Sequence, residues 1–249
     1  FMTAWQVFEL GSPIARWVYQ RYGCFSIERE GTDLRAFKRA VQILSDDSHP
    51  LVIFPEGDVY HCNDRVTPFR EGTAAVALSA ARHASRPIVA VPCALKYQYL
   101  QDPTPDLECV MSELERSIHW RPRTGQPLAD RIYHFAEAAV ALKELEYVGS
   151  TRPGSLPDRV RGLIEHVLGG MEQSHGLGSR DQTIPERVKN SRRACLEKLE
   201  TTNGDPTIVA GLDAQLADLF FVVQLFSYPG DYVAERPTIE RLAETIDKF

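Results

Sequence analysis

The chain has 249 residues, of which 43% are hydrophobic and 25% are charged, so it is long enough to bury a sizeable core. Its formal net charge of -6 argues against a nucleic-acid-binding protein, which normally carries a basic face. Five scattered cysteines without a Cys-x-x-Cys pair favour a reducing, cytoplasmic setting over a disulfide framework. The most apolar late stretch, residues 216–228, is shorter than the roughly 20 residues that a membrane-spanning helix needs.

The first elements alternate between helix and strand. Residues 4–22, broken at Gly11-Ser12-Pro13, predict two short helical pieces, and residues 25–27 predict a short strand. Thr32 or Asp33 is suited to cap a helix in which apolar residues recur at helical spacing, namely Leu34, Phe37, Val41 and Leu44.

Two more strands and a helix follow. The apolar run 51–54 predicts a strand, and residues 72–84 predict a helix that is small and apolar nearly all round and therefore buried. Residues 88–91 predict a further strand, which 93–99 extend. This β-α-β-α-β order predicts an α/β fold, with a largely parallel sheet flanked by helices.

Beyond residue 101 the pattern is helical. Predicted helices cover 106–118, 132–148, 156–168, 185–199, 212–226 and 237–249, and the best linker is 151–157, which holds Pro153, Gly154 and Pro157. The sequence thus predicts an α/β domain over residues 1–150 and an α-helical C-terminal extension over residues 151–249.

One tetrapeptide, Phe54-Pro55-Glu56-Gly57, stands at the end of a predicted strand. Pro55 cannot donate a ladder hydrogen bond and Gly57 can adopt a positive φ, so the strand should stop there and present Glu56. In an open α/β sheet this carboxyl edge is where ligands bind.

Three further blocks surround this tetrapeptide: Gly23 to Arg29, Phe69-Arg70-Glu71-Gly72, and an apolar run ending at Pro92. In this order the four blocks resemble the glycerolipid acyltransferase family, which includes lysophosphatidic acid acyltransferases. The resemblance covers roughly residues 23–99. It implies an O-acyltransferase of phospholipid biosynthesis that moves a fatty acyl group from a coenzyme A or acyl carrier protein thioester to a lysophospholipid or glycerol-phosphate-type acceptor.

Two departures from the family pattern matter. Residues 58–60 replace the Thr-Arg-Ser that often follows the third block, which puts a phosphate contact there in doubt. The family's His-x-x-x-x-Asp block, which carries the catalytic base, is absent, because none of the seven histidines has Asp five positions later. The simplest interpretation is a chain truncated at its N-terminus and inactive alone. The alternative is a non-catalytic lipid- or phosphate-binding relative.

The resemblance implies a set of substrate-binding residues, while the catalytic residue stays unknown: Arg29, Phe54, Pro55, Glu56, Gly57, Arg70 and Gly72. Guanidinium groups suit phosphate, although Arg29 could instead pair with a neighbouring glutamate and Arg70 with Glu71 or Asp64. The implied setting is peripheral, at the inner face of the membrane, with no metal, no tightly bound cofactor and no nucleic acid.

Two other interpretations stay open. Glu56, Asp58, His61 and Asp64 are potential ligands of a divalent cation, although their spacing matches no defined metal motif. The aromatic residues of the tail could form a membrane- or partner-binding surface, although aromatic residues at helical spacing are more often core: Phe220, Phe221, Phe226, Tyr228 and Tyr232.

Overall fold

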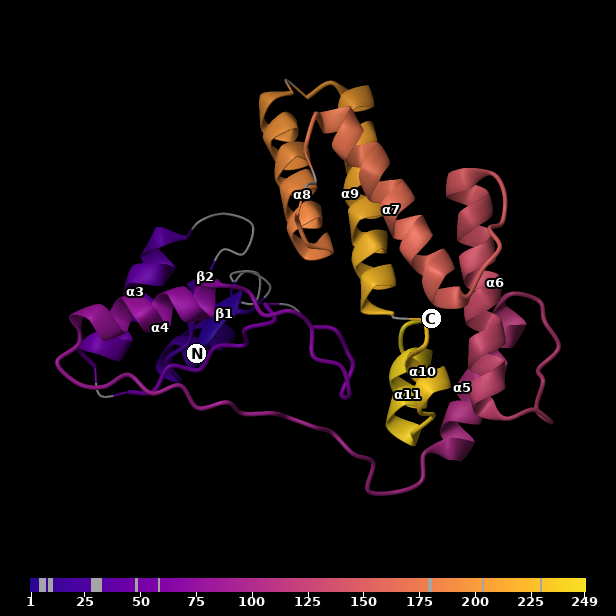
Figure 1. The fold of residues 1–249 in the computed structure, drawn as a ribbon, viewed down its shortest axis with the longest axis horizontal. Helices are drawn as coiled ribbons and strands as arrows, with labels where there is room; N and C mark the ends of the chain where they lie inside the picture. The colour runs from indigo at the N-terminus through magenta and orange to yellow at the C-terminus, as the bar shows by residue number, and fades with distance from the viewer. Residues whose placement is uncertain are drawn as a thin grey trace. The chain divides into compact units, whose positions relative to one another are not determined.

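The computed structural model describes residues 1–4, 8, 11–27, 33–47, 49–57, 59–178, 181–202, 204–228 and 230–249. It divides the chain into two compact units (Figure 1). The first comprises residues 1–60 and 65–95, and the second comprises residues 61–64 and 96–249. This division differs from the boundary expected near residue 150.

The first unit holds a two-stranded parallel sheet. Strand β1 (Met2–Ala4) pairs with β2 (Phe25–Ile27) in the register Met2 to Phe25, and the helix α2 (Pro13–Arg21) connects them. Ser12 begins α2, since its side chain accepts a hydrogen bond from the Ala15 amide at 3.2 Å. The prediction of β2 and of the second helical piece is confirmed. Of the first piece, Ala4 lies in β1 and most of residues 5–10 lie outside the described residues.

The larger predicted sheet does not form. Residues 51–54 and 87–99 have no regular secondary structure, so the strands predicted at 51–54 and 88–91 were wrong. The first of these segments approaches β1 through one bond, in which the Met2 amide donates to the Val52 carbonyl at 3.2 Å. Val89 is 75% exposed. An apolar run becomes a strand only where a neighbour supplies a hydrogen-bonding ladder, and propensity alone does not create that neighbour.

Two helices pack on each other in this unit. Asp33 caps α3 (Leu34–Ser45), accepting from the Arg35 and Ala36 amides at 3.1 and 2.9 Å, and α4 (Gly72–His83) follows the loop. The buried side chains are small and four residues apart on each helix, and they are Ala36, Ala40, Val76 and Ala80. Both predicted helices are confirmed, but burial of α4 nearly all round was wrong. Leu78 is 62% exposed, because α4 packs mainly on α3.

The second unit is helical. Its elements are α5 (Thr104–Ser117), α6 (Leu128–Val148), α7 (Leu156–His175), α8 (Ile184–Thr201), α9 (Pro206–Ser227), α10 (Tyr232–Glu235) and α11 (Ile239–Ile246). Helices α7, α8 and α9 lie side by side around one apolar core, and α5, α6, α10 and α11 surround a second (Figure 1). The predicted helical character of the C-terminal region is confirmed.

The predicted linker is a tight connection within this unit. Gly149 ends α6 in the left-handed region, and Ser155 caps α7. Between them the Arg152 amide donates to the buried carboxylate of Glu144 at 3.1 Å, and Arg159 of α7 donates to the same carboxylate at 2.8 and 3.1 Å. These bonds explain why α6 and α7 belong to one unit.

The tail aromatic residues contribute mainly to the core. Tyr228 and Tyr232 are buried, and Phe221 and Phe226 are half-buried against the first core, whereas Phe220 is 65% exposed. Among the described residues, Pro206–Glu235 is the one stretch long and apolar enough to cross a membrane, so the expectation that no span is visible needs correction. Only 17% of its most apolar window is buried, and soluble core helices can meet the same criterion.

Candidate functional site in the first unit

The residues after Phe54 form a hydrogen-bonded turn. The Gly57 amide donates to the Phe54 carbonyl at 3.1 Å, and the Arg70 amide donates to the Pro55 carbonyl at 2.8 Å. Gly57 has a φ of +70°, a backbone conformation that residues other than glycine rarely adopt. The turn is therefore built as predicted, although no strand leads into it.

Glu56 is held by a side chain from the far end of the loop. The Thr67 hydroxyl donates to Glu56 Oε2 at 2.9 Å, and Thr67 is buried while Glu56 is half-buried. This bond fixes one carboxylate oxygen and orients the side chain. The carboxylate, as an acceptor-only group, suits contact with ligand hydroxyls.

Arg70 lies against the same turn. A Cβ atom placed on Gly57 would overlap the Arg70 side chain, so the guanidinium packs over the Gly57 backbone. Arg70 is half-buried and stands two residues before Gly72, the first residue of α4. The Glu71 side chain makes no capping bond to α4. A guanidinium and a helix N-terminus both favour an anion.

The structure thus brings Arg70 against the turn that holds Glu56 and Gly57, and Gly72 lies two residues beyond Arg70. Pro55 supplies the carbonyl that anchors Arg70, and Phe54 is mostly exposed. Arg29 lies outside the described residues. A carboxylate beside a guanidinium at a helix start suits a ligand that carries both hydroxyl groups and a phosphate.

The proposed ligands of a cation have other partners. Thr67 donates to Glu56, His61 pairs with Asp247 at 3.2 Å, and Asp64 accepts from Lys96 and Arg241. Asp58 is outside the described residues, and within the described part no three His, Cys, Asp or Glu side chains are grouped to hold a metal ion. The contacts give this interpretation no support.

Comparison with known proteins gives a family match. Residues 1–96 match the family model described as Acyltransferase. The N-terminal segment is acyltransferase-like. The match covers less than half of the chain and ends beside Leu95, the last residue of the first unit. No curated protein and no solved structure matches. The match indicates acyl transfer in general, and it confirms the resemblance for this segment.

All seven predicted substrate-binding residues lie within the acyltransferase-like segment. The sequence did not reveal a polar network that joins its loop residues 61–64 to the helices of the second unit. The Asn63 amide donates to Glu244 at 3.1 Å, and the Asp64 amide donates to the Tyr232 hydroxyl at 3.2 Å. The residues joined by these two bonds are 181 and 168 positions apart in the sequence, so no local sequence pattern indicates the bonds.

Asp64 is the charged centre of this network. Hydrogen bonds from Lys96 and Arg241 hold the pKa of its carboxyl below the usual range. Arg241 Nε donates to Asp64 Oδ2 at 3.0 Å, while its guanidinium also lies over the Tyr232 ring at 4.6 Å from the centroid. These contacts make residues 61–64 part of the second unit.

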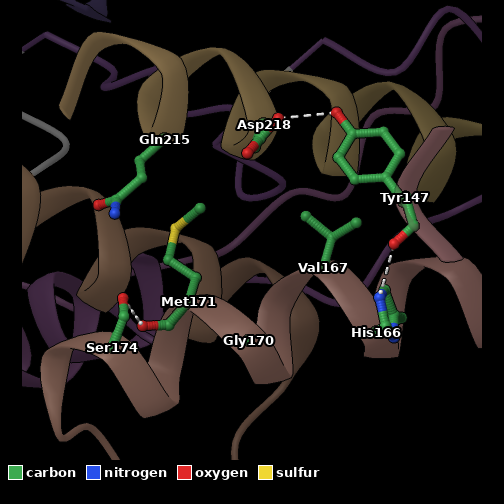
Figure 2. Close-up of a pocket in the computed structure, with 8 residues that line it drawn as sticks. All are labelled: Tyr147, His166, Val167, Gly170, Met171, Ser174, Gln215 and Asp218. Carbon is green, nitrogen blue, oxygen red and sulfur yellow. Dashed lines mark hydrogen bonds between the residues drawn. The ribbon is translucent and has the colours of Figure 1, made fainter. Parts of the chain in front are cut away.

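A separate pocket lies outside the acyltransferase-like segment (Figure 2). Its volume is about 280 Å³, and residues of α6, α7 and α9 line it. The Tyr147 hydroxyl donates to Asp218 at 2.7 Å across one end, and Met171 lies on the wall (Figure 2). It contains none of the predicted substrate-binding residues.

One cysteine near this pocket has chemically suggestive neighbours. Cys195 Sγ lies 3.6 Å from His175 Nε2 and 3.4 Å from Gln215 Oε1. The thiol is fully buried, and desolvation raises its pKa. A buried thiol with a raised pKa is a poor nucleophile, so this cluster is a packing feature of α7, α8 and α9.

Proposed function

We propose that the protein is a glycerolipid-type O-acyltransferase. In this proposal a fatty acyl group moves from a coenzyme A or acyl carrier protein thioester to a lysophospholipid or glycerol-phosphate-type acceptor, as a step of phospholipid biosynthesis. The proposed location is cytoplasmic and peripheral, at the inner face of the membrane. The family match over residues 1–96 supports acyl transfer.

The observation that carries the acceptor class is that Glu56 lies in the turn and that Arg70 packs against Gly57 of the same turn. Thr67 orients the carboxylate, and Gly57 lets the guanidinium lie against the backbone. We assign the phosphate of the acceptor to Arg70 and to the first amides of α4, and its hydroxyl groups to Glu56. Arg29 is the proposed second phosphate contact.

The acyl transfer step needs a base for the acceptor hydroxyl. As the oxygen attacks the thioester carbonyl, the base takes its proton, and the thiolate leaves and is protonated. Such a base typically contributes about 100-fold to 10,000-fold in rate. None of the seven histidines has Asp five positions later, so the second candidate is a non-catalytic binder of the same ligands.

Acceptor binding tests the site directly. Calorimetry with glycerol 3-phosphate and with lysophosphatidate should show about tenfold weaker binding for Glu56→Gln, Arg70→Gln and Arg29→Gln, the scale of a lost charged hydrogen bond. Asp46→Asn and Arg82→Gln remove one charge of each sign at exposed positions of the same unit and should bind like the parent. Equal losses in these controls would contradict the assigned site.

Thiol release from palmitoyl-coenzyme A, and from palmitoyl-acyl carrier protein, separates the two candidate functions. Release that depends on lysophosphatidate supports the acyltransferase. Acceptor binding without acceptor-dependent release of either thiol supports the non-catalytic binder. If neither acceptor binds and no thiol is released, both candidates are wrong.

A further inference from the structure

Helix α2 presents an apolar face to solvent. Ile14 is 76% exposed and Trp17 is 58% exposed, three residues apart, and no residue of the helix is buried. On another side of the helix, Tyr19 packs edge-on against Phe8 at 5.9 Å between ring centroids. The contact of Tyr19 with Phe8 therefore leaves Ile14 and Trp17 exposed to solvent.

The charges on this helix have one sign. Residues 13–22 contain Arg16 and Arg21 and no Asp or Glu, although the whole chain has a net charge of -6. Both arginines are exposed, and the Arg21 guanidinium lies 5.2 Å from the centre of the Trp17 ring. Ile14, Trp17 and Arg21 thus share one face, whereas Arg16 lies about 160° from Ile14 around the helix.

This combination fits one kind of partner. Tryptophan and arginine concentrate at the level of lipid headgroups, where the indole is half-immersed and the guanidinium meets phosphate. Anionic lipids attract a cationic segment from water, and each nearby arginine strengthens binding about fivefold. A nine-residue helix is marginal alone in water, so contact on its exposed face also stabilises it.

We propose that α2 is a membrane-contact helix that lies on the surface of an anionic bilayer. Ile14 and Trp17 enter the headgroup region, Arg21 contacts lipid phosphates, and Arg16 adds positive charge close to the bilayer surface. The helix ends at Arg21, two residues before Gly23, and β2 begins at Phe25, four residues before Arg29 in the sequence. The purpose of this contact rests on the proposed function, because a lysophospholipid acceptor resides in the membrane.

Vesicle co-sedimentation of the whole chain tests the proposal, with phosphatidylcholine vesicles that contain or lack phosphatidylglycerol. Trp17→Ser should weaken partition onto the anionic vesicles by about threefold or more, through lost apolar burial. Leu78→Ser, at an equally exposed apolar position of α4, should leave partition unchanged. Circular dichroism spectra of both variants should match the parent.

A second pair of variants tests the charge. Arg16→Gln combined with Arg21→Gln should weaken partition onto the anionic vesicles by about tenfold or more. Added salt should also weaken the partition of the parent protein. Arg35→Gln combined with Arg82→Gln removes the same charge from exposed positions of α3 and α4 and should bind like the parent. Equal losses in both pairs, or no loss in the α2 variants, would overturn the proposal.

This inference can fail independently of the proposed function. The α2 variants should bind soluble glycerol 3-phosphate like the parent, whereas Glu56→Gln should bind it about tenfold more weakly and keep its partition onto vesicles. Vesicle binding that persists in all α2 variants would overturn the membrane role of α2 and leave the acceptor site standing.

Discussion

At the scale of single residues, the turn after Phe54 depends on one glycine. Gly57 has a φ of +70°, and a Cβ atom there would overlap the Arg70 side chain. Gly72, at the start of α4, has no heavy atom within 4 Å of such a Cβ atom. The two glycines therefore serve different purposes although both were predicted from one resemblance.

This difference leads to a prediction for Gly57→Ala. The left-handed backbone costs a side-chain-bearing residue about 1–2 kcal/mol, and Arg70 must also move away from the turn. We expect a lower free energy of unfolding for the first unit and weaker binding of glycerol 3-phosphate. Urea unfolding and calorimetry measure the two effects.

Gly72→Ala is the matched control. Alanine is the better helix former by up to about 1 kcal/mol, so this variant should be as stable as the parent or slightly more stable. If Gly57→Ala and Gly72→Ala changed the free energy of unfolding equally, the contact of Arg70 with Gly57 would not explain why the turn needs glycine.

At the scale of elements, two adjacent residues of α9 have opposite environments. The Phe221 ring stacks on Tyr147 of α6 with 5.3 Å between centroids and an angle of 3°, and Phe220 points to solvent. Tyr147 also donates to Asp218, and burial together with this bond raises its pKa. The contact surface between α6 and α9 thus combines aromatic stacking with a half-buried hydrogen bond.

Phe221→Asp should destabilise the second unit by about 3 kcal/mol, because a carboxylate replaces an aromatic group in the core. Phe220→Asp should change stability by less than about 0.5 kcal/mol, as exposed substitutions generally do. Thermal unfolding followed by circular dichroism compares the two. A Phe221→Asp protein with unchanged melting and lost vesicle binding would show that the aromatic residues form an interface.

At the scale of the whole molecule, the loop that follows Glu56 contributes four residues to the second unit. Residues 61–64 are held by Glu244, Tyr232 and Arg241. Glu244 accepts both the Asn63 amide and the Tyr232 hydroxyl, the latter at 2.6 Å. Residues of α10 and α11 therefore hold residues 61–64 within the second unit.

Glu244→Ala should release this segment. Removing the shared acceptor should speed hydrogen exchange of the Asn63 and Asp64 amides by about tenfold or more, the equivalent of roughly 1.4 kcal/mol. Mass spectrometry of peptides that cover residues 61–65 measures this rate. Glu235→Ala, at an exposed position of α10, should leave the rate unchanged.

A contrary result would be equally clear. If Glu244→Ala left the exchange of these amides at the rate of the parent, the bonds to Glu244 and Tyr232 would not govern the loop. If Glu235→Ala accelerated exchange to the same extent, general loosening of α10 would account for the effect.

The sequence by itself determined the helices, because capping residues and apolar spacing act within a few residues of each other. Asp33 and Ser155 begin α3 and α7 as local hydrogen-bond acceptors, and the ordered motifs located the acyltransferase-like segment. Only the tertiary structure decided which apolar runs pair as strands, because a ladder needs a distant partner. It also decided the contacts of Glu56 with Thr67, of Arg70 with Gly57 and of Asp64 with Arg241, because side chains far apart in sequence meet only after the chain folds.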